Sequence, residues 1–352
     1  MSQKMNPFPG LRPFEMQEKY LFFGREDQTV ELLKRLGQAR FLAVVGTSGS
    51  GKSSLVRAGL LPELHGGTMT DAGSSWEISV MRPGGDPLTN LARALEDSGI
   101  YDTDEDNYYR HLRAMLGRST MGLIEAVAQS KIKKEDNLLI VVDQFEEIFR
   151  FRSDNANHAE EAANFINLLL EASEQTEKSI FVIITMRSDF LGDCSQFRGL
   201  AEAVNEGEYL IPRLNRNQRR LAIEGPVKVG GKQIEARLVQ ELLNDIGDDP
   251  DQLPILQHAL MRTWEYHEKG GGQGNLDLEH YEATGGMQEA LSRHADEVYD
   301  ELSTDEDRKY CEKIFKSLTE RVSEGRGVRR PMAMGELAEA VGVDDPRKLV
   351  PI

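Results

Sequence analysis

Residues 46–53 read Gly46-Thr47-Ser48-Gly49-Ser50-Gly51-Lys52-Ser53, which fills the pattern G-x-x-x-x-G-K-[ST]. The apolar run 41–45 precedes this stretch, and a helix-compatible segment begins at Ser54. A strand, a glycine-rich turn and a helix in this order form a P-loop, whose backbone N–H groups point at phosphate oxygens. Lys52 is then expected to reach the β- and γ-phosphates, and the Ser53 hydroxyl to bind Mg²⁺. A Gly/Ser-rich loop without a ligand is the simpler alternative, but its context favours a nucleotide site at residues 46–54.

Composition excludes several classes of protein. The chain has 352 residues, with 59 acidic against 42 basic ones and a formal charge of −17. This length allows two or three domains, and the negative charge makes nucleic acid an unexpected partner. Cys194 and Cys311 show no CxxC spacing, so neither a disulfide framework nor a zinc site is expected. Without a membrane-length apolar run or a signal peptide, we expect a cytoplasmic protein with no membrane partner.

Short apolar runs alternate with helical patterns in the first part of the chain. Strands are expected at 41–45, 76–81, 138–142 and 180–186, with helices at 87–96, 106–129 and 158–174. This alternation predicts an α/β fold, in which a parallel sheet is covered by helices on both faces. A Pro- and aromatic-rich arm at 6–23 is expected to lie extended on the core. A helix starting near Asp27 should follow the arm.

The pattern changes after Pro212, where the strands stop. Helices are expected at 216–224, 236–246, 253–267 and 286–302. A helix from Asp307, a strand-like piece at 327–332 and a helix at 335–340 then suggest a winged-helix unit that ends before its third helix, as in a truncated chain. We therefore expect an N-terminal arm and first helix (1–38), a P-loop nucleotide-binding domain (39–213), a helical lid domain (214–286) and an incomplete winged-helix domain (287–352).

Another predicted strand ends in acidic residues. The run 138–142 is followed by Asp143, as in a Walker B element, and Asp143 is expected to hold Mg²⁺ mostly through its waters. Glu146 and Glu147 follow closely enough to orient or deprotonate an attacking water. We expect Glu146 to take this role, with Glu147 as its rival. A solvated acidic turn is the alternative.

An arginine follows each of the two remaining predicted strands. The run 180–186 is followed by Arg187, which is placed to sense a γ-phosphate, unless it is simply paired with Asp189. Residues Arg82-Pro83-Gly84-Gly85 follow the run 76–81 and are expected to form a turn. Whether this turn lies near the nucleotide is left open.

Taken in order, these motifs resemble those of STAND-class ATPases, the signal-transducing branch of the AAA+-related P-loop proteins that includes NACHT and NB-ARC domains. Residues 23–26 resemble the family's hxGRE element, which implies that Arg25 lies near the adenine and ribose. Residues 143–147 resemble the NACHT-type Walker B, although Gln144 replaces a usually small residue. Residues 185–187 resemble the sensor-1 arginine element. Residues 252–256 resemble the GLPL element without its glycine, so only Pro254 is carried over, as a residue that packs on the adenine.

The resemblance implies a switch rather than a metabolic enzyme. Such a protein closes around ADP as a resting monomer, exchanges it for ATP, hydrolyses ATP slowly, and opens to self-associate. The family's sensor and effector regions are expected to lie outside this chain. A winged helix often binds DNA, but in so acidic a chain we expect it to act as an intramolecular brake. Two other functions remain open. A small-molecule kinase would not be expected to carry the helical and winged-helix parts, and an AAA+-type nucleic-acid-linked ATPase predicts a basic channel and an arginine finger.

Overall fold

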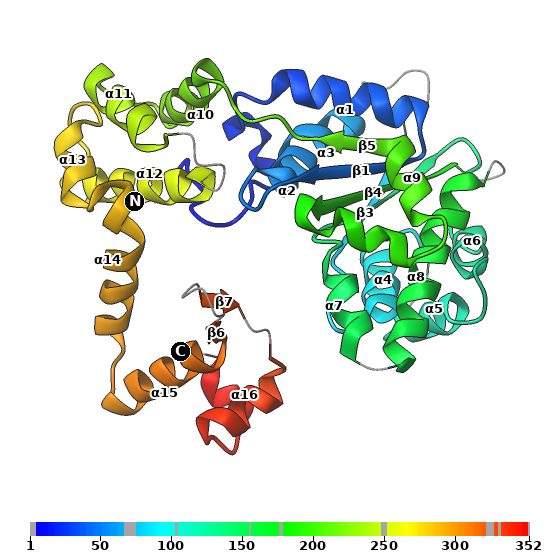
Figure 1. Ribbon diagram of the computed structural model, residues 1–352. Coiled ribbons are helices and arrows are strands. Elements are labelled where there is room, and N and C mark those ends of the chain that lie inside the picture. The colour runs from blue at the N-terminus through cyan, green and yellow to red at the C-terminus, as the bar shows by residue number, and fades with distance from the viewer. Residues whose placement is uncertain are drawn as a thin grey trace. The chain divides into compact units, whose positions relative to one another are not determined.

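We describe a computed structural model of the chain (Figure 1), which covers residues 5–66, 75–102, 105–154, 156–175, 179–247, 252–321, 327–329 and 332–350. Contacts divide it into two units, Met1–Ala283 and Thr284–Ile352. No helix in these described ranges is long and apolar enough to cross a membrane.

A parallel sheet forms the centre of the first unit. Its strands in the described residues are β1 (Phe41–Gly46), β2 (Trp76–Met81), β3 (Asn137–Val142), β4 (Ser179–Arg187) and β5 (Glu208–Leu210), in the order β2-β3-β4-β1-β5. Strands β1, β3 and β4 are almost entirely buried, as near-continuous apolar runs in a covered parallel sheet should be. The sequence predicts the first four strands, and the three-residue β5 is too short to give an apolar pattern.

Helices cover both faces of this sheet (Figure 1). One face carries α1 (Glu26–Gln38), α2 (Lys52–Ser54), the π-helical turn η2 (Leu55–Leu60) and α3 (Leu61–His65). The other face carries α4 (Pro87–Asp97), α5 (Tyr109–Leu116), α6 (Gly122–Ala128), α7 (Glu147–Asp154), α8 (Ala156–Glu174), the 3-10 turn η3 (Ser188–Gln196) and α9 (Leu200–Gly207). Alternate strand residues enter two separate cores, so that Ala43 packs on the α4 side and Val44 on the α1 side. The predicted α/β fold class is confirmed.

One predicted helix is divided in the structure. The pattern at 106–129 predicts a single helix, but α5 ends at Leu116 and α6 begins at Gly122. A Cβ on Gly122 would lie 2.4 Å from the backbone oxygen of Met115. The absence of a side chain at Gly122 therefore allows α6 to pack directly against the end of α5, and both helices keep their apolar faces on the same core.

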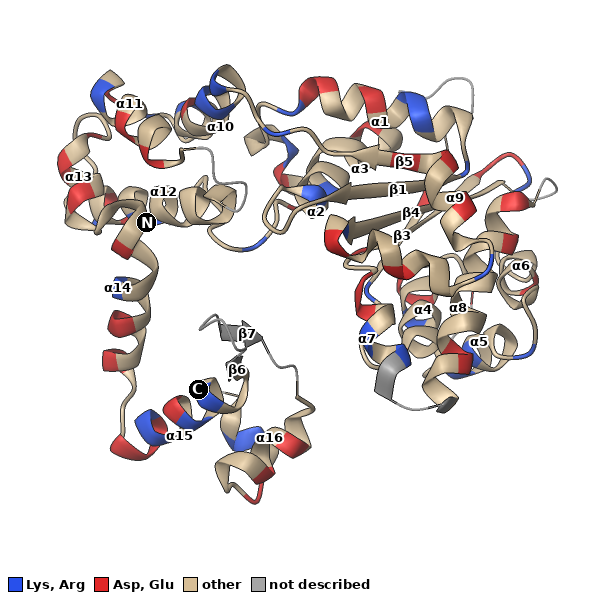
Figure 2. Ribbon diagram, viewed as in Figure 1, with Lys and Arg blue, Asp and Glu red and all other residues tan. Residues whose placement is uncertain are grey.

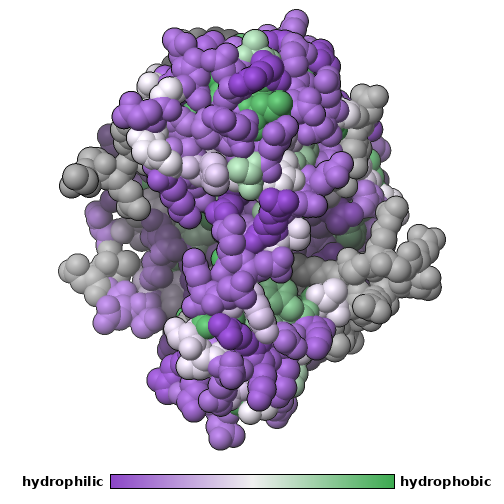
Figure 3. Space-filling model, turned by 90° about the vertical axis from the view of Figure 1, so that its left-hand side faces the viewer, coloured by the Kyte–Doolittle hydropathy of each residue, from purple (hydrophilic) through white to green (hydrophobic). Residues whose placement is uncertain are grey.

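A helical subdomain follows the sheet within the first unit. It contains α10 (Arg216–Val229), α11 (Ala236–Asp245), α12 (Gln252–Lys269) and α13 (Leu278–Ala283). On the face shown in Figure 3, the described surface is mostly hydrophilic, with small and separate hydrophobic spots. Figure 2 shows basic residues on α2 and α10, and acidic residues spread over α1, α13 and α14.

The N-terminal arm packs on this helical subdomain and on the sheet domain. Phe8 is buried against Trp264 of α12, with ring centroids 6.4 Å apart, and Asn6 Nδ2 donates to the carbonyl of Met261. Phe14 packs on Phe22 and its N–H donates to Ser54 Oγ at 3.2 Å. The aromatics thus hold the arm as the sequence predicts, although residues Met16–Leu21 form a 3-10 helix, η1, instead of extended chain.

The second unit is small and has its own apolar cluster. It contains α14 (Gly286–Glu301), α15 (Asp305–Ser317), the antiparallel pair β6 (Thr319–Arg321) and β7 (Gly327–Arg329), α16 (Met334–Val341) and the 3-10 turn η4 (Pro346–Leu349). Leu337, Val341 and Leu349 are buried together there. Residues 330–331 of the predicted strand lie outside the described residues. The winged-helix interpretation and the predicted four-part division of the chain stay predictions.

Candidate functional site

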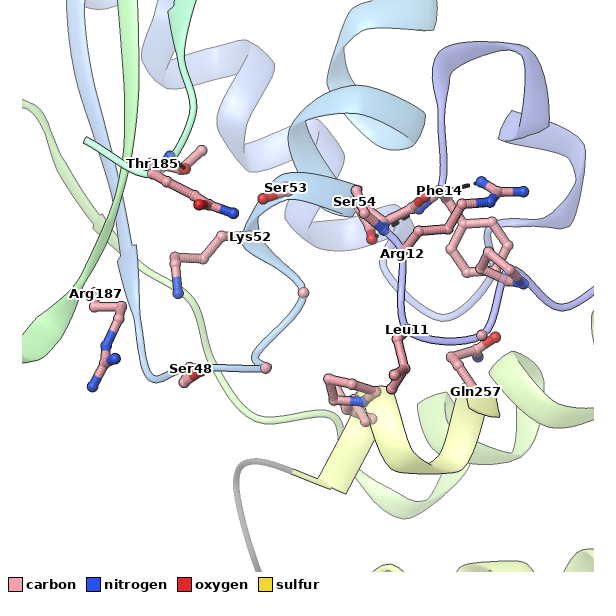
Figure 4. A pocket seen from close by; sticks show the side chains of 18 of the residues that line it. Leu11, Arg12, Phe14, Ser48, Lys52, Ser53, Ser54, Thr185, Arg187 and Gln257 are labelled. Atoms are coloured by element: carbon pink, nitrogen blue, oxygen red, sulfur yellow. Dashed lines mark hydrogen bonds between the residues drawn. The ribbon is translucent and has the colours of Figure 1, made fainter. Parts of the chain in front are cut away.

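A cavity of about 280 Å³ opens at the carboxyl ends of the strands, beside the loop 46–51 (Figure 4). We call it the P-loop cavity. Its walls are residues of the arm (Pro9, Gly10, Leu11, Arg12, Pro13, Phe14), of the loop and α2 (Ser48, Gly49, Gly51, Lys52, Ser53, Ser54), of the strand ends (Arg82, Gln144, Glu146, Thr185, Arg187) and of α12 (Leu253, Pro254, Gln257). Ligands of open α/β sheets bind at this edge.

The loop has the backbone geometry of a phosphate cradle. Gly51 has φ +88°, a left-handed conformation that favours glycine, and α2 begins at the next residue. Lys52 Nζ donates to the carbonyls of Gly46 at 3.0 Å and Thr47 at 2.7 Å, so the ammonium lies across the loop. Burial lowers the pKa of Lys52, and the nearby carboxylate of Glu146 opposes this shift. Lys52 is therefore a partly desolvated cation that faces the cavity.

Asp143 lies behind Ser53 at the end of β3 and is almost fully buried. Its Oδ1 accepts hydrogen bonds from Ser53 Oγ at 2.6 Å and from Thr185 Oγ1 at 2.7 Å. Its Oδ2 lies 3.1 Å from the guanidinium of Arg57 and 3.7 Å from that of Arg82. Hydroxyl and carboxylate oxygens are the donors that Mg²⁺ prefers, so this pair of side chains fits the predicted metal site.

The two acidic residues after Asp143 point to different places. Glu146 lines the P-loop cavity, and burial raises its pKa against the opposing effects of Lys52 and Arg187. Glu147 does not line the cavity, and its Oε2 instead accepts the backbone N–H of Gly84 at 2.9 Å. Of these two acids only Glu146 lines the cavity, and the choice between them as the water-activating residue stays a prediction.

Gln144 adopts a left-handed backbone conformation, with φ +58°. Its N–H donates to Thr185 Oγ1 at 3.0 Å, which ties the turn after β3 to β4. Glycine, which lacks a Cβ, adopts this conformation at lower cost than any residue with a side chain. The positive φ therefore gives a physical reason for glycine at this position, and Gln144 bears the cost of its Cβ.

Arg187 lies at the cavity and is also paired with the carboxylate that the sequence offered as the alternative to a phosphate. It lines the P-loop cavity from the end of β4 (Figure 4). Its guanidinium pairs with the carboxylate of Asp189. Its backbone N–H lies 3.4 Å from Glu146 Oε2. The sensor role of Arg187 stays a prediction.

A second cavity, also of about 280 Å³, lies on the other side of the loop. We call it the Arg25 cavity; Arg25, Gly46, Thr47 and Ser50 line it together with apolar residues that include Ile211, Leu214 and Leu253. Arg25 is itself buried and donates to the carbonyls of Pro212 at 2.6 Å and Ser50 at 3.0 Å. Burial lowers the pKa of Arg25 to about 10. The guanidinium thus braces the P-loop against the segment after β5, beside an apolar space that suits a planar base.

Pro254 lines the P-loop cavity but not the Arg25 cavity, while its neighbour Leu253 lines both. The predicted packing of Pro254 on adenine stays a prediction. Sequence reasoning missed Arg57, and it left open whether the turn at Arg82 lies near the nucleotide without linking Arg82 to Asp143. Arg57 is one turn after Ser53 on the same helical stretch, which was a usable signal, whereas nothing in the sequence pairs Arg82 with Asp143.

Together these elements define a P-loop NTPase in which β4 lies between the strand of the P-loop and the strand of the acidic motif. The chain belongs to the family nSTAND1, Novel STAND NTPase 1, which it matches over residues 7–350. No curated protein sequence matches it. The predicted STAND membership is therefore confirmed.

Solved structures agree on the fold. The Orc1 protein of Aeropyrum pernix in complex with DNA is similar with a TM-score of 0.56 at 14% identity, over 99% of this chain and 85% of that one. The Orc2 protein of Aeropyrum pernix, in ADPNP-ADP complexes, has a TM-score of 0.54 at 12% identity, over 94% of this chain and 79% of that one. At these identities the likeness concerns the fold alone.

Proposed function

We propose that this NTPase binds adenine nucleotide with Mg²⁺ at residues 46–54, and that nucleotide exchange and slow hydrolysis control its conformation and self-association. One observation carries the proposal. The hydrogen-bonded group of Ser53, Asp143 and Thr185 lies beside a P-loop whose cavity is walled by both the arm and α12. A bound nucleotide would therefore touch the catalytic strand ends and the helical subdomain at once.

The chain's own residues have distinct roles in this proposal. Loop N–H groups and Lys52 would bind the phosphates, and Arg187 would contact the γ-phosphate. Ser53 and Asp143 would hold Mg²⁺, which neutralises phosphate charge when bound. Glu146 would orient the attacking water and accept its proton, since it is the acid that faces the cavity. The apolar Arg25 cavity would receive the base.

Coupling requires that ADP and ATP favour different positions of the helical subdomain. Moving a two-state equilibrium from 99:1 to 1:99 takes about 5.5 kcal/mol of differential binding. One charge-assisted arginine–phosphate contact supplies about 1.5–3 kcal/mol, so further contacts must contribute. The arm is suited to this because Phe8 packs on α12 while Phe14 bonds to Ser54 beside the loop. The second unit would act as a brake on opening.

The test is calorimetry with ADP and with a non-hydrolysable ATP analogue. Lys52→Ala should weaken both by about ten- to a hundredfold, because a charge-assisted contact to phosphate is lost. Lys34→Ala, at an exposed position on α1, is the matched control and should leave binding unchanged. Unchanged affinity of Lys52→Ala would refute the proposed site.

Self-association needs a separate measurement. Light scattering should give a larger mass with the ATP analogue than with ADP. Equal mass and shape in both states would leave a nucleotide-binding NTPase without a switch.

A nucleic-acid-linked ATPase is the alternative, because a similar structure is that of Orc1 in complex with DNA. The formal charge of −17 opposes it, since DNA binding draws on basic side chains. DNA that accelerates phosphate release at physiological salt would favour this alternative over the switch.

A further inference from the structure

The turn after β2 brings another arginine to the P-loop cavity. Met81 is paired with Val142 in the sheet, and the N–H of Asp143 donates to the carbonyl of Met81 at 2.8 Å. The residue after Met81, Arg82, therefore reaches Asp143 and lines the same cavity as Lys52. Neither the P-loop pattern nor the acidic motif assigns it a function.

This turn is held from two sides. Glu147 Oε2 accepts the N–H of Gly84 at 2.9 Å, and Asn90 Nδ2 donates to the carbonyl of Pro83 at 2.8 Å. Gly84 has φ +57°, and a Cβ there would lie 2.9 Å from Asn90 Nδ2, so a larger residue would disturb the turn. The backbone of Arg82 is thus fixed beside the acidic motif by Glu147, the acid that does not line the cavity.

The two guanidinium groups near Asp143 are not equivalent. Arg57 lies 3.1 Å from Asp143 Oδ2, is 18% exposed and also bonds Glu15 Oε1 at 2.8 Å. Arg82 lies 3.7 Å from the same oxygen and is 46% exposed. Two carboxylates, those of Asp143 and Glu15, hold Arg57, whereas Arg82 contacts only Asp143 in the part of the chain that the structure describes, so Arg82 is the less constrained of the two cations.

The other arginines that line the P-loop cavity have closer acidic partners. Arg12 pairs with Glu18 at 2.5 Å, and Arg187 pairs with Asp189. Arg82 has only the longer contact to Asp143 among the ion pairs of the described residues. It is therefore the cavity arginine that loses least by turning to a new anion.

We propose that Arg82 contacts the terminal phosphate of a bound nucleoside triphosphate and so makes the site prefer triphosphate over diphosphate. The inference rests on the proposed function. Phosphate oxygens accept paired hydrogen bonds from a guanidinium, and arginines stabilise the charge of a transferring phosphoryl group. Because β2 and β4 lie on either side of β3, Arg82 and Arg187 flank the acids of β3.

The experiment compares Arg82→Ala and Arg82→Lys by calorimetry, with Mg²⁺ and either ADP or a non-hydrolysable ATP analogue. Arg82→Ala should weaken the triphosphate by about ten- to a hundredfold and leave ADP affinity unchanged. Arg82→Lys should keep part of the triphosphate affinity, because it keeps the charge but not the planar fork. Arg93→Ala, at an exposed position on α4, is the matched control and should change neither affinity. A thermal melt of each variant confirms folding.

The outcomes separate the possible failures. Equal loss of ADP and triphosphate affinity would mean that Arg82 acts on Asp143 and not on the γ-phosphate, which overturns the inference. If Arg82→Ala changes neither the ADP affinity nor the triphosphate affinity, the inference is also overturned. No nucleotide binding by the unaltered chain would overturn the proposed function together with the inference.

Discussion

Replacing each of two neighbouring acids by its amide gives the sharpest test of the site. Glu146→Gln and Glu147→Gln each remove one charge and preserve side-chain shape. Only Glu146 lines the P-loop cavity, while Glu147 holds the N–H of Gly84. The adjacent positions serve as matched controls for one another, because both follow the same strand.

The expected magnitudes follow from these contacts. A positioned general base contributes about 10²–10⁴-fold to a rate, so Glu146→Gln should slow hydrolysis at least about a hundredfold. In Glu147→Gln the amide oxygen can still accept from Gly84. Exchanging a charged for a neutral acceptor costs about 1 kcal/mol, so the rate should change by no more than about fivefold.

The assay is single-turnover hydrolysis of ATP, with ATP binding measured separately by calorimetry. Glu146→Gln should bind ATP and retain it, because the charge that opposes the γ-phosphate is gone. A slower Glu147→Gln would transfer the water-activating role to Glu147. If neither substitution slows turnover, the interpretation of the acidic motif is wrong.

Three further results are expected. Burial raises the pKa of Glu146 above its ordinary 4.5, so hydrolysis should already slow on acidification while the pH is still above 4.5; Glu146→Gln should raise the melting temperature at neutral pH, and this gain should shrink as the pH falls through the raised pKa and vanish only below the unfolded-state value of about 4.5. Phe8→Ala should release the arm from α12, because replacing a buried Phe by Ala costs about 3–5 kcal/mol, and limited proteolysis should then cleave the arm faster. The control is Val30→Ala, at a side chain that is 65% exposed, which should leave the proteolysis pattern unaltered. Gln144→Gly should lower the free energy of unfolding by less than about 1 kcal/mol, and Gln144→Val should lower it by about 1–2 kcal/mol more, because a β-branched side chain fits poorly at a φ of +58°. Equal melting temperatures for the two variants would contradict this.

Some elements could be predicted because their signals are local. A buried parallel strand is a continuous apolar run, and a P-loop needs its glycines, lysine and serine at fixed spacing. The strands at 41–45 and 180–186 and the loop at 46–53 could therefore be predicted from the sequence. The short strand β5 could not be predicted, because three residues are too few to show an apolar period. The division between α5 and α6 could not be predicted either, because it depends on how Gly122 packs on Met115.

The sequence by itself determined the family, the α/β fold and the position of the P-loop, since each depends on residue types close together in the chain. Tertiary structure alone decided which acid faces the P-loop cavity, that Arg82 reaches Asp143, and that the arm joins α12 to the loop. Those facts depend on pairing between strands and on aromatic packing between distant segments. Such contacts leave no period or spacing in the sequence, because the residues that meet are set by the fold and not by their separation along the chain.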